Sequence, residues 1–502
     1  MLVGIDCGGT TAKVGVYDDN GFCRGTLARR LRTSSERPRW AERDMGEMWL
    51  DVAGCIRDAL DLAGASGADV TAVGVCGHSD GLYAVDADGR PVRRAILATD
   101  SRAVTVVSEW DRQGLLDHVL EMAGQRPAEP SQAALFAWLR RSEPESVASM
   151  RWLLTAKDWL RLCLTGRVGA DFSEANASFG ALDGWTYDSR IPQLLGIPEV
   201  SGLLAPLAAA TDLAGGVTAS AARLTGLRAG TPVAFGAHDI VAAVVGSGIT
   251  GADRYCIVAG TWGVNAVLAQ DRIIDHRWQS RRWVTGDGWV HMSASPASTS
   301  NLDWFLRFGQ PGEVDLGEIN EQVARVLDDP LDILFFPFLF GSPEGAAASA
   351  AFLGLRGWHT RAHMMRAVFQ GVIFNHLMQL DALRERFGAL PLRLTGGGSR
   401  SPVWGQLLAD VADAVVEVPT VEETGCWGSA LCAGVGVGRY PSLSSAPQTA
   451  ARGIASRFVP RAARHDALLE GYARYRAVLG RLNEIWPLLS PGAGAGPPPA
   501  AG

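Results

Sequence analysis

Two glycine-rich segments near opposite ends of the chain place the strongest constraint on its fold. Residues 2–18 read LVGIDCGGTTAKVGVYD, so that apolar and small residues alternate on both sides of a Gly-Gly-Thr-Thr turn. This alternation predicts a β-hairpin with hydroxyl groups and backbone amides at its tip. Successive N–H groups form an anion-binding nest and glycine allows a close approach, so the tip is suited to phosphate.

Asp6 lies just before this turn, where its carboxylate can face the same phosphate. Two anions side by side make sense only with a divalent cation between them, so Asp6 is a candidate metal ligand. The alternative is a carboxylate that is bonded only to local turn amides. The second segment, residues 394–410, reads LTGGGSRSPVWGQLLAD and predicts a strand, a glycine turn and a helix. Together the segments indicate a nucleotide held between two lobes.

Length and composition are those of a two-domain globular enzyme. The chain has 502 residues, of which 47% are hydrophobic and 20% charged. The formal net charge of −7 means that the chain has no excess of basic residues for binding nucleic acid. The sequence has neither a signal-peptide pattern nor a membrane-spanning apolar run, so we expect a cytoplasmic protein without a membrane partner. The eight cysteines are scattered without a CxxC pair, and we expect them to be reduced.

Strands and helices alternate along the chain, which predicts an α/β fold. We expect a domain over 1–243, a second domain over 244–488 and a disordered, Pro/Gly/Ala-rich tail over 489–502. A second hairpin, over 255–268, repeats the Gly-Thr turn of the first. Further expected elements are strands over 70–75 and 232–236 and helices over 45–63, 132–140, 240–248, 361–387, 403–412 and 425–438.

Lysine is almost absent, because only two of the 46 basic residues are lysine. Where lysine persists under such a bias, the site can require a compact point charge rather than a planar fork. Lys13 lies on the first hairpin, and we interpret it as a phosphate contact, with a solvated strand charge as the alternative. We interpret Lys157 as one half of a structural ion pair.

These segments resemble the FGGY family of carbohydrate kinases, within the actin/Hsp70/sugar-kinase superfamily. The resemblance runs from Leu2 to about Tyr475, and its strength is that the motifs occur in the family's order. Besides the two glycine-rich segments, the matching stretches are 40–44 (WAERD), 95–102 (AILATDSR), 157–160 (KDWL), 164–166 (LTG), 236–239 (GAHD), 260–263 (GTWG) and 422–431 (EETGCWGSAL).

The resemblance implies two ribonuclease-H-like domains with the active site in the cleft between them. It implies transfer of the ATP γ-phosphoryl group to a primary hydroxyl, which depends on positioning, a metal and a base. Asp239 aligns with the family's catalytic aspartate, and the alternative for it is a helix N-cap. Asp6 is expected to hold Mg²⁺ through water, and ATP is the expected co-substrate.

The resemblance also assigns nucleotide contacts. On the first hairpin these are Gly9, Thr10, Thr11 and Lys13; elsewhere they are Gly260, Thr261, Gly397, Gly398 and Ser401. A glycine turn that serves packing alone is the alternative for residues 397–401. The small residues of the helix over 425–438 are expected to leave room beneath the adenine base.

For the acceptor sugar, the matching positions are His78, Asp80, Asp100, Arg102 and Asp239. Ala98 stands where glycerol kinases have tryptophan, which argues against glycerol. The branch with the most similar pattern contains L-xylulose/3-keto-L-gulonate kinases. Because Asp80 would repel an anionic acceptor, we expect a neutral ketopentose such as L-xylulose, with a tetritol such as erythritol or 3-keto-L-gulonate as alternatives.

A different class of function is a sugar-binding or ATPase relative without kinase activity. The combination of Asp6, Thr10 and Asp239 argues against it. The expected partners are the sugar and ATP, and a homodimer is one assembly that the sequence allows.

Overall fold

The computed structural model describes residues 1–175, 177–307, 315–330, 332–342, 348–446 and 453–489. Its contacts divide the chain into two compact units. Unit 1 comprises Met1–Ala252, Leu268–His291 and Glu423–Gly453, and unit 2 comprises Asp253–Val267, Met292–Glu422 and Ile454–Gly502. The predicted boundary at 243/244 stays a prediction, and the tail predicted to be disordered lies outside the described residues from 490 onward.

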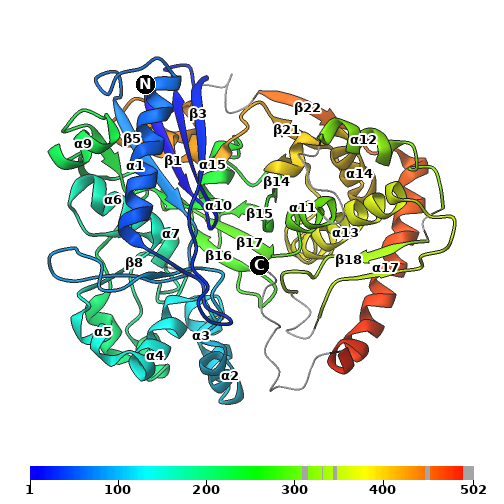
Figure 1. The fold of residues 1–502 in the computed structure, drawn as a ribbon, viewed down its shortest axis with the longest axis horizontal. Helices are drawn as coiled ribbons and strands as arrows, with labels where there is room; N and C mark the ends of the chain where they lie inside the picture. The colour runs from blue at the N-terminus through cyan, green and yellow to red at the C-terminus, as the bar shows by residue number, and fades with distance from the viewer. Residues whose placement is uncertain (176, 308–314, 331, 343–347, 447–452, 490–502) are drawn as a thin grey trace. The chain divides into compact units, whose positions relative to one another are not determined.

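A seven-stranded sheet forms the centre of unit 1 (Figure 1). Hydrophobic alternation placed the first hairpin correctly: its two strands pair antiparallel, and the first strand runs parallel to the strand after α1 (Met45–Leu62). The strand order is β11 (Leu213–Gly216), β12 (Pro232–Ala234), β5 (Ala72–Gly77), β1 (Leu2–Cys7), β2 (Thr11–Tyr17) and β3 (Cys23–Arg30), and β13 (Ala237–His238) also pairs with β5.

Two helices rich in small residues pack on the central strands of this sheet. They are α10 (Asp239–Gly246) and α15 (Thr424–Gly436). A Cβ atom at Gly4 would lie 1.8 Å from the Cys426 carbonyl oxygen, and one at Gly74 would lie 1.8 Å from that of Ser429. Glycines of β1 and β5 therefore allow the backbone of α15 to pack directly on these strands, and the predicted space beneath an adenine base stays a prediction.

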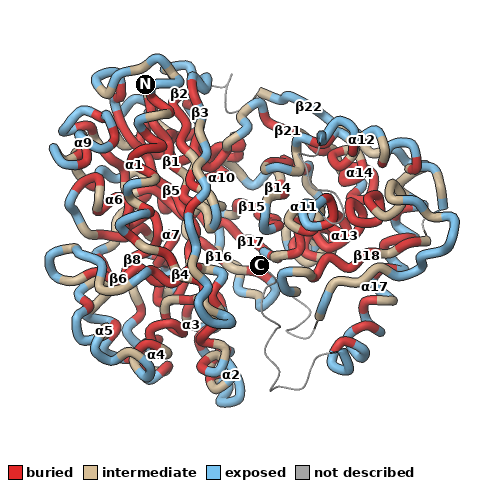
Figure 2. Tube along the Cα trace, in the orientation of Figure 1, coloured by how far each residue is buried: buried red, intermediate tan, exposed pale blue. Residues whose placement is uncertain are grey.

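A second apolar core lies further along unit 1, around α2 (Val104–Arg112), α3 (Leu115–Ala123) and α4 (Gln132–Ser142). Several short elements complete the unit. These are α6 (Ala156–Thr165), β9 (Ala170–Asp171), α7 (Phe172–Ala175) and β16 (Gln279–Arg282), with α7 packed against both β13 and β16. Figure 2 shows how thoroughly β1, β5 and α7 are buried.

The second seven-stranded sheet has the order β16, β17 (Trp289–Ser295), β15 (Gly263–Ala269), β14 (Tyr255–Ala259), β20 (Leu392–Thr395), β21 (Val416–Pro419), β22 (Ile454–Phe458). The hairpin β14–β15 is antiparallel and β14 runs parallel to β20, which repeats the arrangement of β1, β2 and β5. This confirms the predicted second hairpin. The helices predicted for this part are α13 (Arg361–Phe387) and α14 (Pro402–Ala412).

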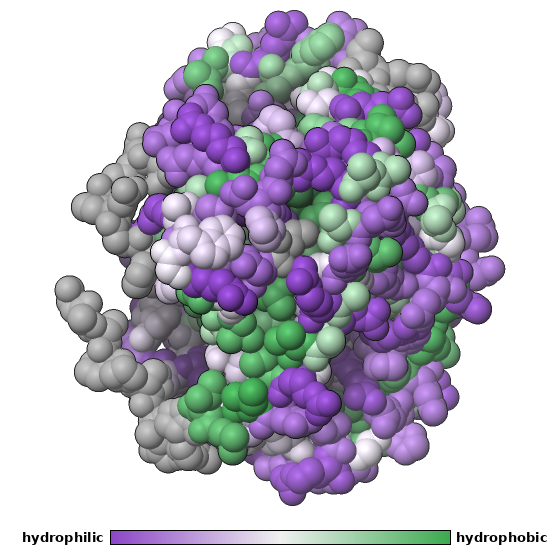
Figure 3. Space-filling view, turned by 90° about the vertical axis from the view of Figure 1, so that its right-hand side faces the viewer, coloured by the Kyte–Doolittle hydropathy of each residue, from purple (hydrophilic) through white to green (hydrophobic). Residues whose placement is uncertain are grey.

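Hydrophilic side chains dominate the face of the molecule shown in Figure 3, and apolar side chains form patches between them. The longest described helix of unit 2 is α17 (Ala462–Leu489), which carries charged residues along its length. Within the described residues, none of the helices combines the length and the apolar character needed to cross a membrane.

Candidate functional site

The tip of the β1–β2 hairpin presents backbone amides. The last strand pair is Cys7 with Ala12, and the N–H of Gly8 donates to the Thr11 carbonyl at 3.1 Å. In the described structure the N–H groups of Gly9 and Thr10 have no protein acceptor, although the Gly9 carbonyl accepts from Arg43 at 2.6 Å. Because Thr10 is exposed, these amides are available to an anion, as a nest requires.

Asp6 occupies the end of β1, opposite Lys13 in the hairpin. Its Oδ1 is buried without a hydrogen-bond partner among the described residues, and a Cβ at Gly425 would lie 2.5 Å from its Oδ2. Burial raises the pKa of Asp6 to about 6, against the attraction of Lys13 and with the repulsion of Glu423. An unsatisfied carboxylate oxygen beside an anion-binding turn is what a bound cation would use.

No cluster of three or more His, Cys, Asp or Glu side chains in the described residues could hold a metal ion alone. The metal-binding role of Asp6 stays a prediction. A single carboxylate fits Mg²⁺, which usually binds one or two carboxylates together with substrate phosphates and water.

Lys13 forms an ion pair that the sequence did not indicate. Its Nζ lies 2.6 Å from Oε2 of Glu423, the residue just before α15. The two residues are 410 positions apart, so only the tertiary fold brings them together. The predicted phosphate contact of Lys13 stays a prediction, and Glu423 is its competing partner.

Asp239 is the first residue of α10, directly after β13. His238 is the N-cap of this helix, so the alternative of Asp239 as the cap residue is wrong, although the Ile240 N–H also reaches Asp239 Oδ1 at 2.7 Å. The Asp239 side chain is 25% exposed, which leaves it accessible to a ligand. Burial raises its pKa to about 7 and Asp6 adds to the rise, while the Ile240 N–H and Arg281 oppose it.

His78 and Asp80 follow β5, next to β13 in the same sheet. Burial lowers the pKa of His78 to about 4, so the ring is neutral; its Nε2 lies 3.4 Å from the Tyr83 hydroxyl. Asp80 has a φ of 59°, a left-handed conformation that is uncommon outside glycine. Burial raises the pKa of Asp80, and the positive charge of Arg281 opposes that rise.

Asp100 and Arg102 form a buried, closely coupled pair. Arg102 Nη2 lies 2.7 Å from Asp100 Oδ2, which also accepts from the Ala41 N–H at 2.7 Å. The Arg102 guanidinium stacks on the Trp40 ring at 3.8 Å and lies 2.8 Å from a Glu42 oxygen. Their predicted contact with the acceptor stays untested, and in this structure their charges are already matched by the protein.

Arg281 is a feature of the site that the sequence analysis missed. It lies on β16, is 1% exposed, and donates to two neutral oxygens, those of Gln125 and Gln279 (Nη2, 3.0 Å). Its Nε has no partner among the described residues. Burial lowers the pKa of Arg281, and the negative charge of nearby carboxyl groups opposes this; they are Asp80, Glu174, Asp239 and Asp171.

Gly260 and Thr261 form the tip of the β14–β15 hairpin in unit 2. The N–H of Gly260 donates to the Trp262 carbonyl at 3.2 Å, and the Gly260 carbonyl accepts from the Thr299 hydroxyl at 2.6 Å. Thr261 is exposed. The tip thus resembles that of the first hairpin, and its predicted phosphate contact stays a prediction.

The other predicted nucleotide contacts of unit 2 follow β20. Gly397 and Gly398 lie in a short 3-10 helix (η2, Gly397–Arg400), as the expected strand–turn–helix requires. A Cβ at Gly398 would lie 2.7 Å from that of Ala259, whereas one at Gly397 would meet no atom within 4 Å. Packing therefore explains Gly398 but not Gly397. Ser401 caps α14 by accepting from the Trp404 N–H at 3.1 Å.

Comparison with known proteins matches this chain along nearly its whole length. The N-terminal domain of the FGGY family of carbohydrate kinases matches residues 1–246, and the C-terminal domain of that family matches residues 255–437. L-xylulose/3-keto-L-gulonate kinase of Escherichia coli K12 is 36% identical over 96% of this chain and 97% of its own.

Two further proteins are similar to this chain, one in sequence and one in fold. A probable L-xylulose kinase of Pasteurella multocida is 35% identical, over 87% of this chain and 90% of its own. The crystal structure of xylulose kinase from Rhodospirillum rubrum has the same fold, with a TM-score of 0.85 at 24% identity over 97% of this chain and 99% of its own. The chain belongs to the FGGY family of carbohydrate kinases.

Proposed function

We propose that this kinase transfers the γ-phosphoryl group of ATP to a primary hydroxyl of a small ketose, with L-xylulose as the first candidate. The observation that carries the proposal is Asp239, a partly exposed carboxylate at the start of α10 whose pKa is raised to about 7. A base is most effective when its pKa is near the working pH. The names of the two relatives above support L-xylulose as the acceptor.

In the proposed reaction, Asp239 orients the acceptor hydroxyl and accepts its proton as the new O–P bond forms. The bond between the γ-phosphorus and the β–γ bridging oxygen breaks at the same time, and ADP leaves with that oxygen. Because phosphoryl transfer needs little covalent chemistry from the protein, positioning and electrostatics supply most of the catalysis.

The Gly9 and Thr10 amides would bind the transferring phosphates, with the Thr10 and Thr11 hydroxyls beside them. Asp6 would hold Mg²⁺, and its unpartnered, buried Oδ1 supports this assignment. When bound, Mg²⁺ supplies positive charge that neutralises the charge developing on the phosphate oxygens. Gly260, Thr261, Gly397 and Ser401 remain candidates for the rest of the nucleotide.

His78 and Asp80 are the proposed contacts to the sugar hydroxyls. Nδ1 of the neutral His78 ring lies 3.1 Å from the Ser79 carbonyl oxygen, to which it donates, so Nε2 is the nitrogen that can accept from a hydroxyl. Their position after β5, parallel to β13 in the sheet, supports this because Asp239 follows β13. An acceptor bound there would lie near the proposed base.

A second candidate acceptor, 3-keto-L-gulonate, is favoured by Arg281. The positive charge of this buried residue opposes the rise in the pKa of Asp80 and of Asp239, so it offsets part of the negative charge on which the argument against an anionic acceptor depended. Electrostatic interactions of this kind are strong where water is excluded.

The test of the proposed function is a coupled ADP-release assay with Mg-ATP and a panel of acceptors: L-xylulose, D-xylulose, erythritol, glycerol and 3-keto-L-gulonate. We expect the highest kcat/KM with L-xylulose. Activity with 3-keto-L-gulonate alone would reverse the order of the two candidates. Nucleotide binding without turnover on any acceptor would contradict the proposal.

Arg281→Gln separates the two candidates further. It should lower kcat/KM for 3-keto-L-gulonate at least fivefold more than for L-xylulose. The matched control is Arg282→Gln, on the same strand, whose guanidinium lies 4.6 Å from the Trp185 ring. Because the readout is a ratio of two acceptors on one enzyme, partial unfolding does not affect it. An unchanged ratio would remove Arg281 from acceptor selection.

A further inference from the structure

The backbone that leads into Asp239 is held at two points by side chains of other elements. The N–H of His238, the residue before Asp239, donates to the Ser173 hydroxyl at 2.9 Å. Three residues earlier, the Phe235 carbonyl accepts from Arg161 Nη1 at 3.2 Å. Gly236 lies between these points with a φ of 76°, and a Cβ there would lie 1.7 Å from the Val75 carbonyl oxygen.

The Ser173 hydroxyl can accept from His238 because its own proton is used elsewhere. Ser173 Oγ donates to Asp171 Oδ2 at 2.5 Å, and the Ser173 N–H donates to the same oxygen at 2.8 Å. A hydroxyl has one proton and two lone pairs, so the donation to Asp171 leaves a lone pair for the His238 N–H. The direction of each hydrogen bond in this chain is thereby fixed.

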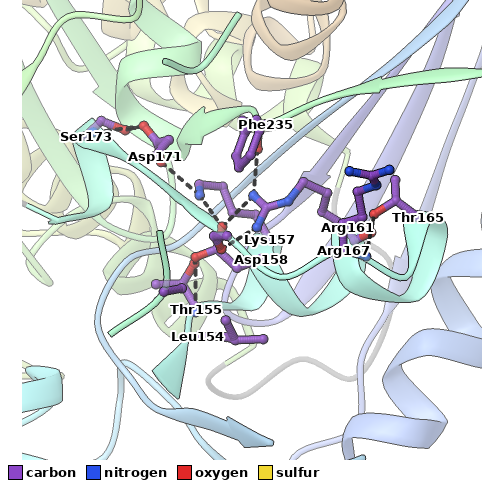
Figure 4. A network of polar contacts seen from close by, with 12 residues as sticks. Leu154, Thr155, Lys157, Asp158, Arg161, Thr165, Arg167, Asp171, Ser173 and Phe235 are labelled. Atoms are coloured by element: carbon purple, nitrogen blue, oxygen red, sulfur yellow. Dashed lines mark hydrogen bonds and ion pairs between the residues drawn. The ribbon is translucent and has the colours of Figure 1, made fainter. Parts of the chain in front are cut away.

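Asp171 is in turn anchored by a buried network of charges, drawn in Figure 4. Lys157 Nζ lies 2.8 Å from Asp171 Oδ1 and 2.6 Å from Asp158 Oδ1, and Arg161 Nη1 lies 2.8 Å from the same Asp158 oxygen. The attraction of Asp158 and Asp171 raises the pKa of Lys157 against the effect of burial, so it stays charged. The predicted structural ion pair of Lys157 is confirmed.

This network joins α6, β9 and α7 to the segment between β12 and α10. Two cations and two carboxylates balance one another, and the four side chains are at most 1% exposed. Buried ion pairs add little net stability compared with apolar packing, but they hold their members in one geometry when every charge has a partner. Arg161 and Ser173 extend that geometry to both ends of residues 235–238.

We infer that Ser173 is a positioning residue for phosphoryl transfer: its hydroxyl connects the Lys157–Asp171 ion pair to the backbone at His238 and so holds Asp239 in place. The inference rests on the proposed role of Asp239 as base. A misplacement of about 1 Å can cost on the order of a hundredfold in rate, so one hydrogen bond at this point can affect kcat.

The test is Ser173→Ala, measured by steady-state kinetics with the best acceptor. We expect kcat to fall at least tenfold, while KM for ATP and for the acceptor changes less than threefold. Ser173→Thr keeps the hydroxyl and should retain at least a third of the wild-type kcat. The matched control is Thr225→Val, which removes a fully buried hydroxyl that donates to the Ala221 carbonyl at 2.8 Å on α9 (Ala219–Thr225) and should leave kcat unchanged.

A role in folding alone would lower the melting temperature of Ser173→Ala and leave kcat per folded enzyme at the wild-type value, which would overturn the inference. Should Ser173→Ala not fold, Ser173→Cys replaces the hydroxyl by a weaker acceptor of similar size, and unchanged kcat in that variant would overturn it as well. Asp239→Asn distinguishes a failure of the proposed base from a failure of the role inferred for Ser173. If Asp239→Asn stays active, the proposed base is wrong; if it is inactive and Ser173→Ala is fully active, only this inference fails.

Discussion

The β1–β2 hairpin of unit 1 and the β14–β15 hairpin of unit 2 share a topology, and each first strand runs parallel to a later strand, β5 or β20. Their side chains differ at matching positions. In the last pair but one, Asp6 opposes Lys13 in the first hairpin, whereas Val258 opposes Val264 in the second. The repeated fold supplies a glycine turn twice, and the charged groups occur in one copy.

This difference predicts that substitutions around the first hairpin and α10 affect chemistry, whereas matched substitutions in the second hairpin affect packing or nucleotide affinity. The largest effect is expected for Asp239→Asn. Without the base we expect kcat to fall by at least about a thousandfold, while ATP still binds. Retention of more than a few per cent of kcat would show that Asp239 is not the base.

The same substitution should stabilise the protein. The pKa of Asp239 is raised from 3.8 to about 7 in the folded state, so ionisation of Asp239 lowers the free energy of unfolding. This loss of stability is complete above pH 7 and becomes smaller as the pH falls toward 3.8. Asp239→Asn should therefore raise the free energy of unfolding by roughly 2–4 kcal/mol at pH 8 and by less at pH 5. Urea unfolding at both pH values measures this, and a loss of stability at pH 8 would contradict it.

The next largest effect tests the two hairpins directly. Asp6→Asn removes the proposed metal ligand without changing its size, and we expect kcat/KM for Mg-ATP to fall about a hundredfold, with a higher Mg²⁺ requirement. Val258→Thr is the matched, isosteric change in the second hairpin and should change kcat/KM less than threefold. Similar losses of kcat/KM in both variants would mean that the two hairpins do not differ in their contribution to catalysis.

The pH profile should reflect the coupled pair of Asp6 and Asp239, whose pKa values are raised to about 6 and about 7. Since the base must be ionised, kcat/KM for the acceptor should fall about tenfold between pH 8 and pH 6. The apparent pKa values belong to the pair, so Asp6→Asn should move the remaining limb to lower pH. A flat profile over this range would exclude a carboxylate base with a raised pKa.

The smallest effect concerns the ion pair of Lys13 and Glu423 near the tip of the first hairpin. If Lys13 contacts phosphate, Lys13→Met should raise KM for ATP about fivefold. Glu423→Gln removes the competing carboxylate, and KM for ATP should then be no higher than in the wild type. An unchanged KM in Lys13→Met would leave the pair with Glu423 as the only role of this lysine.

Local pattern was sufficient for the hairpins, for the helix boundaries to within a few residues and for the candidate Asp6, because each depends on alternation or on a turn within a few residues. Asp239 was named from the resemblance to the family. Arg281 could not be found in this way. The strand β16 carries Arg281 and Arg282 side by side, and only the position of α7 and Gln125 decides which one is buried. The pair of Lys13 and Glu423 likewise depends on tertiary structure.

The small residues of α15 show a different kind of limit. The sequence shows that bulky side chains are absent there, but not which neighbour requires this. The structure gives β1, β5 and α10 as protein neighbours, and the space beneath an adenine base stays a prediction. A pattern of glycine and alanine predicts close approach without identifying the group that approaches.

The position of α15 also determines how much of the chain the first strands need as neighbours. The Ser429 hydroxyl lies 3.4 Å from the carbonyl oxygen of Ile5, 424 residues earlier, and a Cβ at Gly425 would lie 2.5 Å from Asp6 Oδ2. A fragment truncated before α15 would therefore leave one face of β1 and β5 uncovered. It would also lack the helix that lies against Asp6, so apolar surface of the first strands and the Asp6 carboxylate would both be exposed to solvent.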